Sequence, residues 1–382
     1  MSRNRKTVFL VAGEASGDLH GANLVRAMNR LAPDLSVVGI GGPHLRDTGM
    51  ETLIDASSLS VVGITEVIAH LPVVLKSLSA IKRFLREMRP DLVILIDYPD
   101  FNLRIAKTAK QLGLPVFYYI SPQIWAWREN RVRIIRERVD HMSVILPFEA
   151  PFYERHGVPV TFVGHPLMDT ELGHHLLPFA SGPQPIDKGP VIGLLPGSRV
   201  GEVRKLLPVM LDAAKHLARR NPSVRFLLSQ APGIPKHLLQ PALPVDGTVP
   251  IEIVPNLLDI FRRSAFVIAA SGTVTLQAAI AGVPPIIVYK VSPLSYHLGK
   301  MLIRVPFIGL INLIAGKRIV PELIQEDANA RTIADTALEL MSNPHRLSAI
   351  RNDLIEARRL LGGPGASERA ARIALSLMER SR

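Results

Sequence analysis

The sequence contains no cysteine, and this absence removes several kinds of chemistry. The chain can form no disulfide, and it offers neither a thiolate nucleophile nor cysteine ligands for zinc or an iron–sulfur cluster. Aromatic residues make up only 5% of the 382 residues. No helix-turn-helix, zinc finger or aromatic–basic sheet motif is recognisable, so a nucleic-acid-binding class is disfavoured.

Long hydrophobic runs are also missing. The apolar run at residues 7–12 is too short for the core of a signal peptide. The uncharged stretch at residues 265–289 contains Gly282 and two adjacent prolines, which would interrupt a membrane-spanning helix. We predict a strand, a helix and a strand at residues 265–269, 273–281 and 285–288. The chain is therefore predicted to be cytoplasmic.

Positive charge is in excess, with 45 lysines and arginines against 33 acidic residues and a formal net charge of +12. This balance favours an anionic partner, either nucleic acid, a membrane surface or a phosphorylated substrate. Hydrophobic residues make up 47% of the chain, which is typical of a folded protein. The length predicts two domains.

Short apolar runs alternate with helical patterns in both halves. The predicted strands are residues 7–12, 36–40, 91–96, 116–120, 142–146, 160–163, 191–195, 224–229, 251–254, 266–269 and 285–288. This alternation predicts an α/β protein with two Rossmann-like, doubly wound parallel sheets facing across a cleft. The predicted parts are an N-terminal domain, a proline-rich linker, a second domain and C-terminal helices, at residues 1–176, 177–190, 191–340 and 341–382.

Two strand-to-helix turns in the second half predict a phosphate site. Gly197 and Ser198 follow the strand at residues 191–195, and the free N–H groups of the next helix favour a phosphate there. Arg199 adds a planar fork of donors. An ordinary turn with a solvated arginine is the alternative.

The second such turn is Ser271-Gly272-Thr273, which also opens a helix. Gln277 lies one helical turn further on, where its amide can reach a ribose or a base edge. Packing of small residues in a tight turn is the alternative explanation.

Acidic residues follow two strands of the first half. The loop after residues 7–12 carries Glu14, Ser16 and Asp18, but it lacks the G-x-G-x-x-G spacing of a dinucleotide site. Asp97 and Asp100 follow the buried strand at residues 91–96. We predict a general base rather than a metal ligand, with Asp97 as the candidate. Asp18 and Asp100 can instead cap helices.

Residues 61–75 are apolar but fit no regular buried face, and basic residues follow within two helical turns. This combination favours contact with acyl chains and an anionic membrane surface. The predicted contact residues are Val61, Ile64, Val67, Ile68, Leu71 and Leu75. A core helix with a solvated basic face is the alternative.

Together these motifs resemble the lipid-A-disaccharide synthase family over nearly the whole chain. The matching segments are residues 11–18 (VAGEASGD), 96–102 (IDYPDFN), 121–127 (SPQIWAW), 163–166 (VGHP), 195–199 (LPGSR), 271–273 (SGT) and 312–316 (NLIAG). The segments at 121–127 and 197–199 are specific for the family when they occur together with the others, but each alone is a weak signal. Lower similarity extends to other GT-B glycosyltransferases.

The resemblance implies an inverting transfer of 2,3-diacylglucosamine from UDP to lipid X (2,3-diacylglucosamine 1-phosphate). The products would be a β-1,6-linked disaccharide 1-phosphate and UDP. It also implies that no bound metal or other cofactor is needed. By position, Asp97 matches the proposed general base, Arg199 the diphosphate-binding arginine and Asn312 an asparagine on the UDP side. Ser16 and Asp18 fall in the N-terminal active-site loop, and Glu14 of the same loop of this sequence is a further catalytic candidate.

The resemblance further implies a peripheral protein of the inner membrane in a Gram-negative bacterium, and dimers that exchange C-terminal segments. The glycine-rich break at residues 362–365 could be their crossing point. One position departs from the expected pattern, because Gln277 stands where a ribose-binding glutamate is usual. A GT-B transferase with a soluble UDP-sugar and acceptor, and a non-catalytic nucleic-acid-binding module, remain the alternatives.

Overall fold

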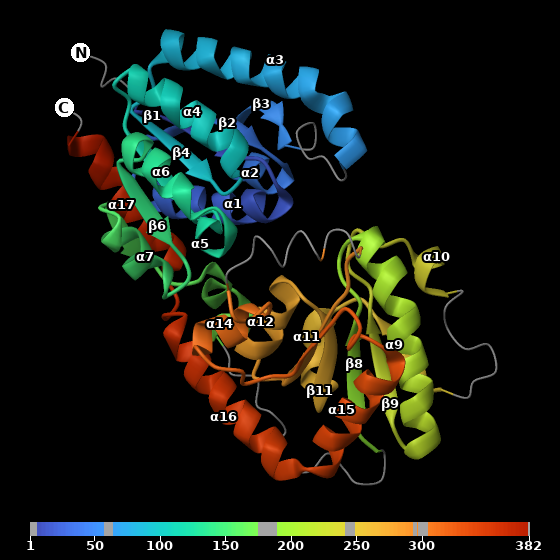
Figure 1. Cartoon of the computed structure of the whole chain (residues 1–382). Coiled ribbons are helices and arrows are strands. Elements are labelled where there is room, and N and C mark those ends of the chain that lie inside the picture. The colour runs from blue at the N-terminus through green and yellow to red at the C-terminus, as the bar shows by residue number, and fades with distance from the viewer. Residues whose placement is uncertain are drawn as a thin grey trace. The chain divides into compact units, whose positions relative to one another are not determined.

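The chain folds into two compact units, which the computed structural model describes separately (Figure 1). The described residues are 6–56, 64–174, 189–240, 249–292, 296 and 305–380, with only the backbone described at residues 15, 64–73 and 174. The first unit comprises Met1–Asp169 and Gly362–Arg382, and the second comprises Thr170–Leu361. The linker predicted at residues 177–190 lies mostly outside the described residues.

The first unit contains a parallel sheet of seven strands in the order β3-β2-β1-β4-β5-β6-β7. Its strands are β1 (Thr7–Ala12), β2 (Ser36–Gly41), β3 (Glu51–Asp55), β4 (Leu92–Ile96), β5 (Val116–Tyr119), β6 (His141–Val144) and β7 (Val160–Phe162). Every residue of β4 is buried, as its continuous apolar sequence predicts for a central parallel strand. The strand order reverses between β1 and β4, which is where such sheets bind ligands.

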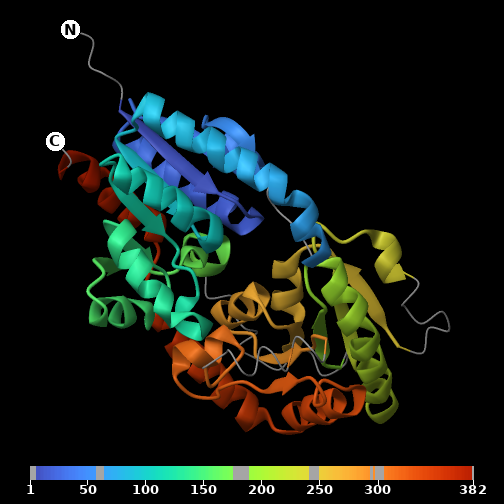
Figure 2. The same cartoon turned by 45° about the horizontal axis from the view of Figure 1, so that its top comes forward.

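Helices cover both faces of this sheet (Figure 1, Figure 2). The helices are α1 (Ala15–Leu31), α2 (Pro43–Arg46), α3 (Ile64–Met88), α4 (Pro99–Gln111), α5 (Ile124–Trp127), α6 (Val132–Arg138), α7 (Glu149–Arg155) and α17 (Ala366–Arg380). Buried side chains of α3, α4 and α6 share one core cluster, and those of α1 and α17 share the other. The C-terminal helix α17 is thus part of the first unit.

Asp169 anchors the return of the chain to the first unit. Its carboxylate accepts hydrogen bonds from the backbone nitrogens of Gly365, Ala366 and Ser367 at 2.6, 3.1 and 3.0 Å. These nitrogens lie at the start of α17, where helices carry unpaired donors and the positive end of the dipole. Asp169, the last residue of the segment Met1–Asp169, therefore caps the first turn of α17 in the segment Gly362–Arg382.

The second unit contains a parallel sheet of six strands in the order β10-β9-β8-β11-β12-β13. Its strands are β8 (Val191–Leu195), β9 (Arg225–Ser229), β10 (Ile251–Val254), β11 (Phe266–Ala270), β12 (Pro285–Tyr289) and β13 (Glu322–Ile324). Its helices are α8 (Glu171–His174), α9 (Val200–Arg220), α10 (Lys236–Leu239), α11 (Leu257–Arg263), α12 (Thr273–Ile280), α14 (Leu310–Ala315), α15 (Ala330–Ser342) and α16 (Pro344–Leu360). The order reverses between β8 and β11.

The two parallel sheets confirm the predicted α/β class, and each predicted strand corresponds to an observed one. Two edge strands escaped prediction. β3 is short and largely polar, and β13 has three residues, so neither presents a clear apolar run. The second unit also extends to Leu361, beyond residue 340, where the sequence suggested its end. Among the described residues, no helix combines the length and the apolar character needed to cross a membrane.

Candidate active site

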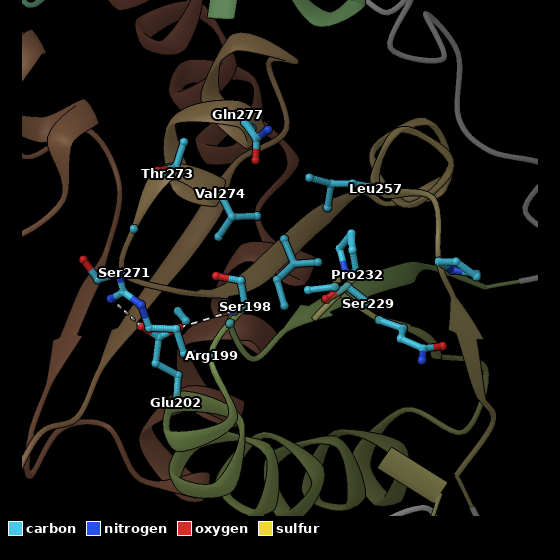
Figure 3. A pocket seen from close by; sticks show the side chains of 17 residues that line it. Ser198, Arg199, Glu202, Ser229, Pro232, Leu257, Ser271, Thr273, Val274 and Gln277 are labelled. Atoms are coloured by element: carbon cyan, nitrogen blue, oxygen red, sulfur yellow. Dashed lines mark hydrogen bonds and ion pairs between the residues drawn. The ribbon is translucent and has the colours of Figure 1, made fainter. Parts of the chain in front are cut away.

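A pocket of about 400 Å³ lies at the carboxyl edge of the second sheet, at the point where the strand order reverses. Segments that follow β8, β9, β10 and β11 line it (Figure 3). Ligands of open α/β sheets bind at this position because two neighbouring loops diverge there. The structure brings together seven predicted residues in this pocket, namely Gly197, Ser198, Arg199, Ser271, Gly272, Thr273 and Gln277.

Gly197 allows the turn between β8 and α9 to fold tightly. Its φ is +119°, a backbone conformation that favours glycine. A Cβ atom at this position would lie 2.5 Å from Oε2 of Glu202, which also accepts a hydrogen bond from the Ser198 nitrogen at 3.3 Å. Glu202 thus connects the first turn of α9 to the turn at Gly197 and Ser198 that precedes it.

Arg199 extends from this turn, with 71% of its side chain exposed. Its only described ion pair is a loose one with Glu202, at 3.5 Å between Nη1 and Oε1. An exposed pair of this kind contributes little stability. The guanidinium can therefore exchange Glu202 for a phosphate, and Figure 3 shows both side chains on the same rim of the pocket.

The turn before α12 presents backbone donors to the same pocket. Gly272 occupies the N-cap position, and no side chain caps the helix there. Thr275 donates its hydroxyl to the Gly272 oxygen at 2.7 Å, which fixes the first turn. Uncapped N–H groups at the starts of α9 and α12 therefore both lie at this pocket, an arrangement suited to a diphosphate.

Several lining residues were missed from the sequence. Ser229, Gln230, Pro232, Pro255, Leu257 and Glu202 line the pocket as well. All of them except Glu202 lie at the end of a predicted strand or within three residues after it, so their position at a carboxyl edge was a usable signal. Leu257 and Val274 add apolar surface, and Gln277 adds an amide at the end of the pocket that Figure 3 shows away from Arg199. The pocket thus has a polar, anion-binding part and a part suited to a nucleoside.

Asn312 does not line this pocket, and the direct contact with UDP that the resemblance implied does not fit its surroundings. The residue is fully buried. Its Nδ2 donates to the Val320 oxygen at 3.0 Å and to Oε1 of Glu322 at 2.8 Å, and its Oδ1 accepts from the nitrogens of Ile319 and Val320. All its hydrogen-bonding capacity is used inside the protein. Asn312 therefore fixes the connection from α14 to β13.

Asp97 lies at the carboxyl end of β4, where the first sheet reverses its order. Asp97 and Tyr98 have consecutive positive φ values of 44° and 47°. Such conformations are unfavourable for residues other than glycine and occur often at functional sites. Two buried side chains stabilise the turn, because Asn102 and Tyr118 donate hydrogen bonds to the backbone oxygen of Asp97 at 2.7 and 2.5 Å.

The environment of Asp97 suits a proton acceptor. Burial, reinforced by the charge of Glu14, raises the pKa of Asp97 to about 6. Glu14 lies in the neighbouring loop after β1, and Gly13 allows the Tyr98 ring to approach that loop, since a Cβ atom there would lie 2.6 Å from Cδ1 of Tyr98. A carboxylate with this pKa is mostly ionised at pH 7 and more basic than an exposed one.

Ser16 and Asp18, the other two predicted catalytic residues, differ in accessibility. Ser16 is exposed in the first turn of α1. Asp18 is 2% exposed, and its carboxylate accepts from the nitrogens of Gly42, His44 and Leu45 at 2.7, 3.0 and 3.1 Å. The prediction of a catalytic role for Asp18 therefore does not fit this geometry. Asp18 holds the turn between β2 and α2.

A buried carboxyl organises the segment at residues 121–127. Glu149 accepts from Nε1 of Trp125 at 3.0 Å and from the nitrogens of Ile145 and Leu146. Burial raises the pKa of Glu149 to about 7. The hydroxyl groups of Ser121 and Tyr153 lie 2.8 Å apart beside it. The role of Glu149 was missed because its side-chain partner, Trp125, lies 24 positions earlier in the sequence.

Of the predicted membrane residues, only Leu75 has a described side chain, and it is 48% exposed. Val61 lies outside the described residues, and the side chains of Ile64, Val67, Ile68 and Leu71 are likewise not described. The segment belongs to helix α3, which runs from Ile64 to Met88. Its C-terminal half buries Leu78, Ile81 and Leu85.

Known proteins resemble this chain both in fold and in sequence. The GT-B fold is shared with a glycosyltransferase of kitacinnamycin, with a TM-score of 0.62 at 16% identity over 99% of both chains. It is also shared with a UDP-GlcNAc 2-epimerase from Neisseria meningitidis bound to UDP-GlcNAc, with a TM-score of 0.59 at 13% identity over 98% of this chain and 100% of the other. These likenesses place the chain in the GT-B fold class.

The sequence separates this chain from the epimerases. A sequence model of the lipid-A-disaccharide synthetase family matches residues 8–377. The lipid-A-disaccharide synthase of Geobacter metallireducens is 47% identical over 380 residues, which cover 99% of this chain and 98% of the relative. This chain belongs to the lipid-A-disaccharide synthetase family, and it is a glycosyltransferase of lipid A synthesis.

Proposed function

We propose that this protein transfers 2,3-diacylglucosamine from UDP to lipid X and releases the β-1,6-linked disaccharide 1-phosphate and UDP. The observation that carries the proposal is the pocket at the strand reversal of the second unit, in a chain of this family. The attacking hydroxyl forms a bond to the anomeric carbon as the bond from that carbon to the diphosphate breaks. The acceptor hydroxyl loses its proton, and UDP leaves with the bonding electron pair.

The donor end of the reaction requires stabilisation of the negative charge that grows on the leaving diphosphate. The N-terminal turns of α9 and α12 supply oriented backbone donors, and Arg199 supplies a charged fork on the pocket rim. Fixed donors of this kind stabilise developing charge without reorganisation during the reaction. Gln277 can accept a hydrogen bond from the uridine or donate one to it. Because its amide is neutral, this bond is weaker than one to the carboxylate of a glutamate.

The acceptor end requires a base. We assign this role to Asp97, whose raised pKa and fixed backbone suit proton removal from the attacking hydroxyl. Glu14 supports this assignment through its charge, and Ser16 offers an exposed hydroxyl nearby in the chain for binding the acceptor. Attack on the face opposite to the leaving group inverts the configuration at the anomeric carbon.

Both substrates carry acyl chains, so we propose that the protein works at the anionic surface of the inner membrane. Removing a chain from the bilayer costs about 0.8 kcal/mol per methylene, which favours an enzyme that docks there. Leu75 and the basic residues after it support this proposal, because they are exposed on α3. Vesicle binding by the paired variant Ile68→Ser with Leu75→Ser tests it, with the melting temperature as the control for folding.

A homodimer with exchanged C-terminal segments is part of the same proposal. The positive φ values of Gly362 and Gly365, 77° and 96°, mark sharp turns at the point where the chain returns to the first unit. In this dimer the partner's α17 would pack against α1, a contact that the chain's own α17 makes in this structure. The molar mass in solution by light scattering tests this assembly.

The experiment for the proposed activity measures UDP release from UDP-2,3-diacylglucosamine by the purified protein in detergent micelles. Release that depends on lipid X supports the proposal. Release from a soluble UDP-sugar with a soluble acceptor, without turnover of the lipid pair, would favour the alternative transferase.

A further inference from the structure

A second cavity, of about 410 Å³, lies on the first unit between α6 and the end of α7. Its polar lining consists mainly of Arg133 and Arg136 on α6, Arg155 and His156 at the end of α7, and Glu129. None of these residues belongs to the proposed transfer site. The cavity therefore needs an explanation of its own.

The three arginines of this cavity have no anionic partner in the part of the chain that the structure describes. Two neighbouring arginines do have an anionic partner, because Arg128 and Arg131 both form ion pairs with Asp100. Glu129, the only acidic residue of the lining, lies 3.6 Å from Nε2 of His156. The cavity thus gathers three guanidinium groups without matching negative charge.

Positive groups that line one cavity repel one another, and an anion inside the cavity would lower that repulsion. Guanidinium groups suit phosphate oxygens because their donors form a planar fork. Arg133 and Arg136 lie three positions apart on α6 and so project from the same side of the helix. Val132 and Ile135 of that helix are buried, which fixes α6 against the sheet.

The position of the cavity indicates where its phosphate would come from. Helices α3, α4 and α6 lie on one face of the first sheet and share a core cluster (Figure 1). On α3, that same face presents exposed Lys76, Arg83 and Arg86, together with Leu75 and Met88, whose exposed fractions are 48% and 58%. Exposed basic and apolar side chains on one layer of helices are typical of a surface that contacts an anionic bilayer.

We propose that the Arg133–Arg136–Arg155 cavity binds the headgroup phosphate of an anionic phospholipid when the first unit docks on a membrane. This inference rests on the proposed function only in assuming that the protein works at a bilayer. Nucleic acid fits less well, because no phenylalanine, tyrosine or tryptophan of the described residues lines the cavity for base stacking.

The test compares the full-length protein with the double variant Arg133→Gln, Arg136→Gln in co-sedimentation with vesicles. One set of vesicles is phosphatidylglycerol and the other is phosphatidylcholine. We expect the variant to lose about tenfold or more of its affinity for phosphatidylglycerol vesicles and to keep its weak binding to phosphatidylcholine. The matched control is Arg204→Gln with Arg219→Gln, which removes the same charge from exposed positions of α9 in the second unit.

Three results would overturn the inference. The first is unchanged affinity for phosphatidylglycerol vesicles, and the second is an equal loss in the control variant, which would indicate general charge attraction. The third is a raised KM for lipid X in micelles with unchanged vesicle binding, which would assign the cavity to the substrate phosphate. Turnover in micelles by the unmodified protein tests the proposed function separately. Vesicle binding can therefore fail while the transferase activity holds, and the reverse also applies.

Discussion

The side-chain amide of Asn102 donates to the backbone oxygen of Asp97 at 2.7 Å and to that of Ile96 at 3.1 Å. Asn102 is a fully buried residue of α4, so these hydrogen bonds attach the end of β4 to that helix. This contact stabilises the positive φ of Asp97, which an aspartate adopts only at a cost. The position of the proposed base is thus set by the packing of the first unit rather than by a mobile loop.

Replacing Asp97 with asparagine should preserve the fold and UDP binding while turnover falls by about 10²- to 10⁴-fold, as expected for loss of a general base. The unmodified enzyme should gain activity as pH rises through about 6, because burial and the Glu14 charge raise the pKa of Asp97 and only its ionised form accepts a proton. Steady-state kinetics across pH measures both effects.

The control is Glu14→Gln, which removes the neighbouring negative charge. The midpoint of the pH profile should move to lower pH, since that charge contributes to the raised pKa. Near-normal turnover of Asp97→Asn, or a midpoint unaffected by Glu14→Gln, would count against Asp97 as the base.

Gly197→Ala should weaken UDP binding and lower the free energy of unfolding by about 1 kcal/mol or more, because alanine is strained at this positive φ. The new Cβ would also displace Glu202 from the turn. Calorimetry with UDP and thermal melting measure the two effects. Gly201→Ala is the matched control, since no atom lies within 4 Å of its added Cβ and helix α9 favours alanine there. Equal behaviour of the two variants would contradict the role given to the turn.

Arg199→Ala should weaken UDP binding without affecting thermal stability, because the side chain is 71% exposed and its pair with Glu202 is loose. Arg199→Lys should restore only part of the affinity, since an ammonium group cannot reproduce the fork of donors. Calorimetric titration with UDP distinguishes the variants. Unchanged affinity in both would remove Arg199 from the diphosphate site.

Asp18→Asn should lower the free energy of unfolding by about 2 kcal/mol, because an amide cannot accept all three backbone hydrogen bonds that the carboxylate accepts. The folded fraction should keep nearly normal turnover. Asp212→Asn, at an exposed ion pair in the second unit, should leave both quantities unaffected. A stable but inactive Asp18→Asn enzyme would restore the catalytic role predicted from the sequence.

Much of the fold followed from the sequence because central parallel strands are continuous apolar runs, as in residues 191–195. The pocket turns were predictable for a related reason, since glycine and serine directly after such a run mark a carboxyl edge. The functions of Asp18 and Asn312 were not predictable. Each binds backbone groups from a separate segment, and local sequence carries no sign of those partners.

The most direct test of the account is the structure of the product formed by the purified enzyme from UDP-2,3-diacylglucosamine and lipid X, analysed by mass spectrometry and NMR. We predict a tetraacyl disaccharide 1-phosphate with a β-1,6 linkage, formed together with an equal amount of UDP. An α-linked product, or UDP released without any disaccharide, would contradict it.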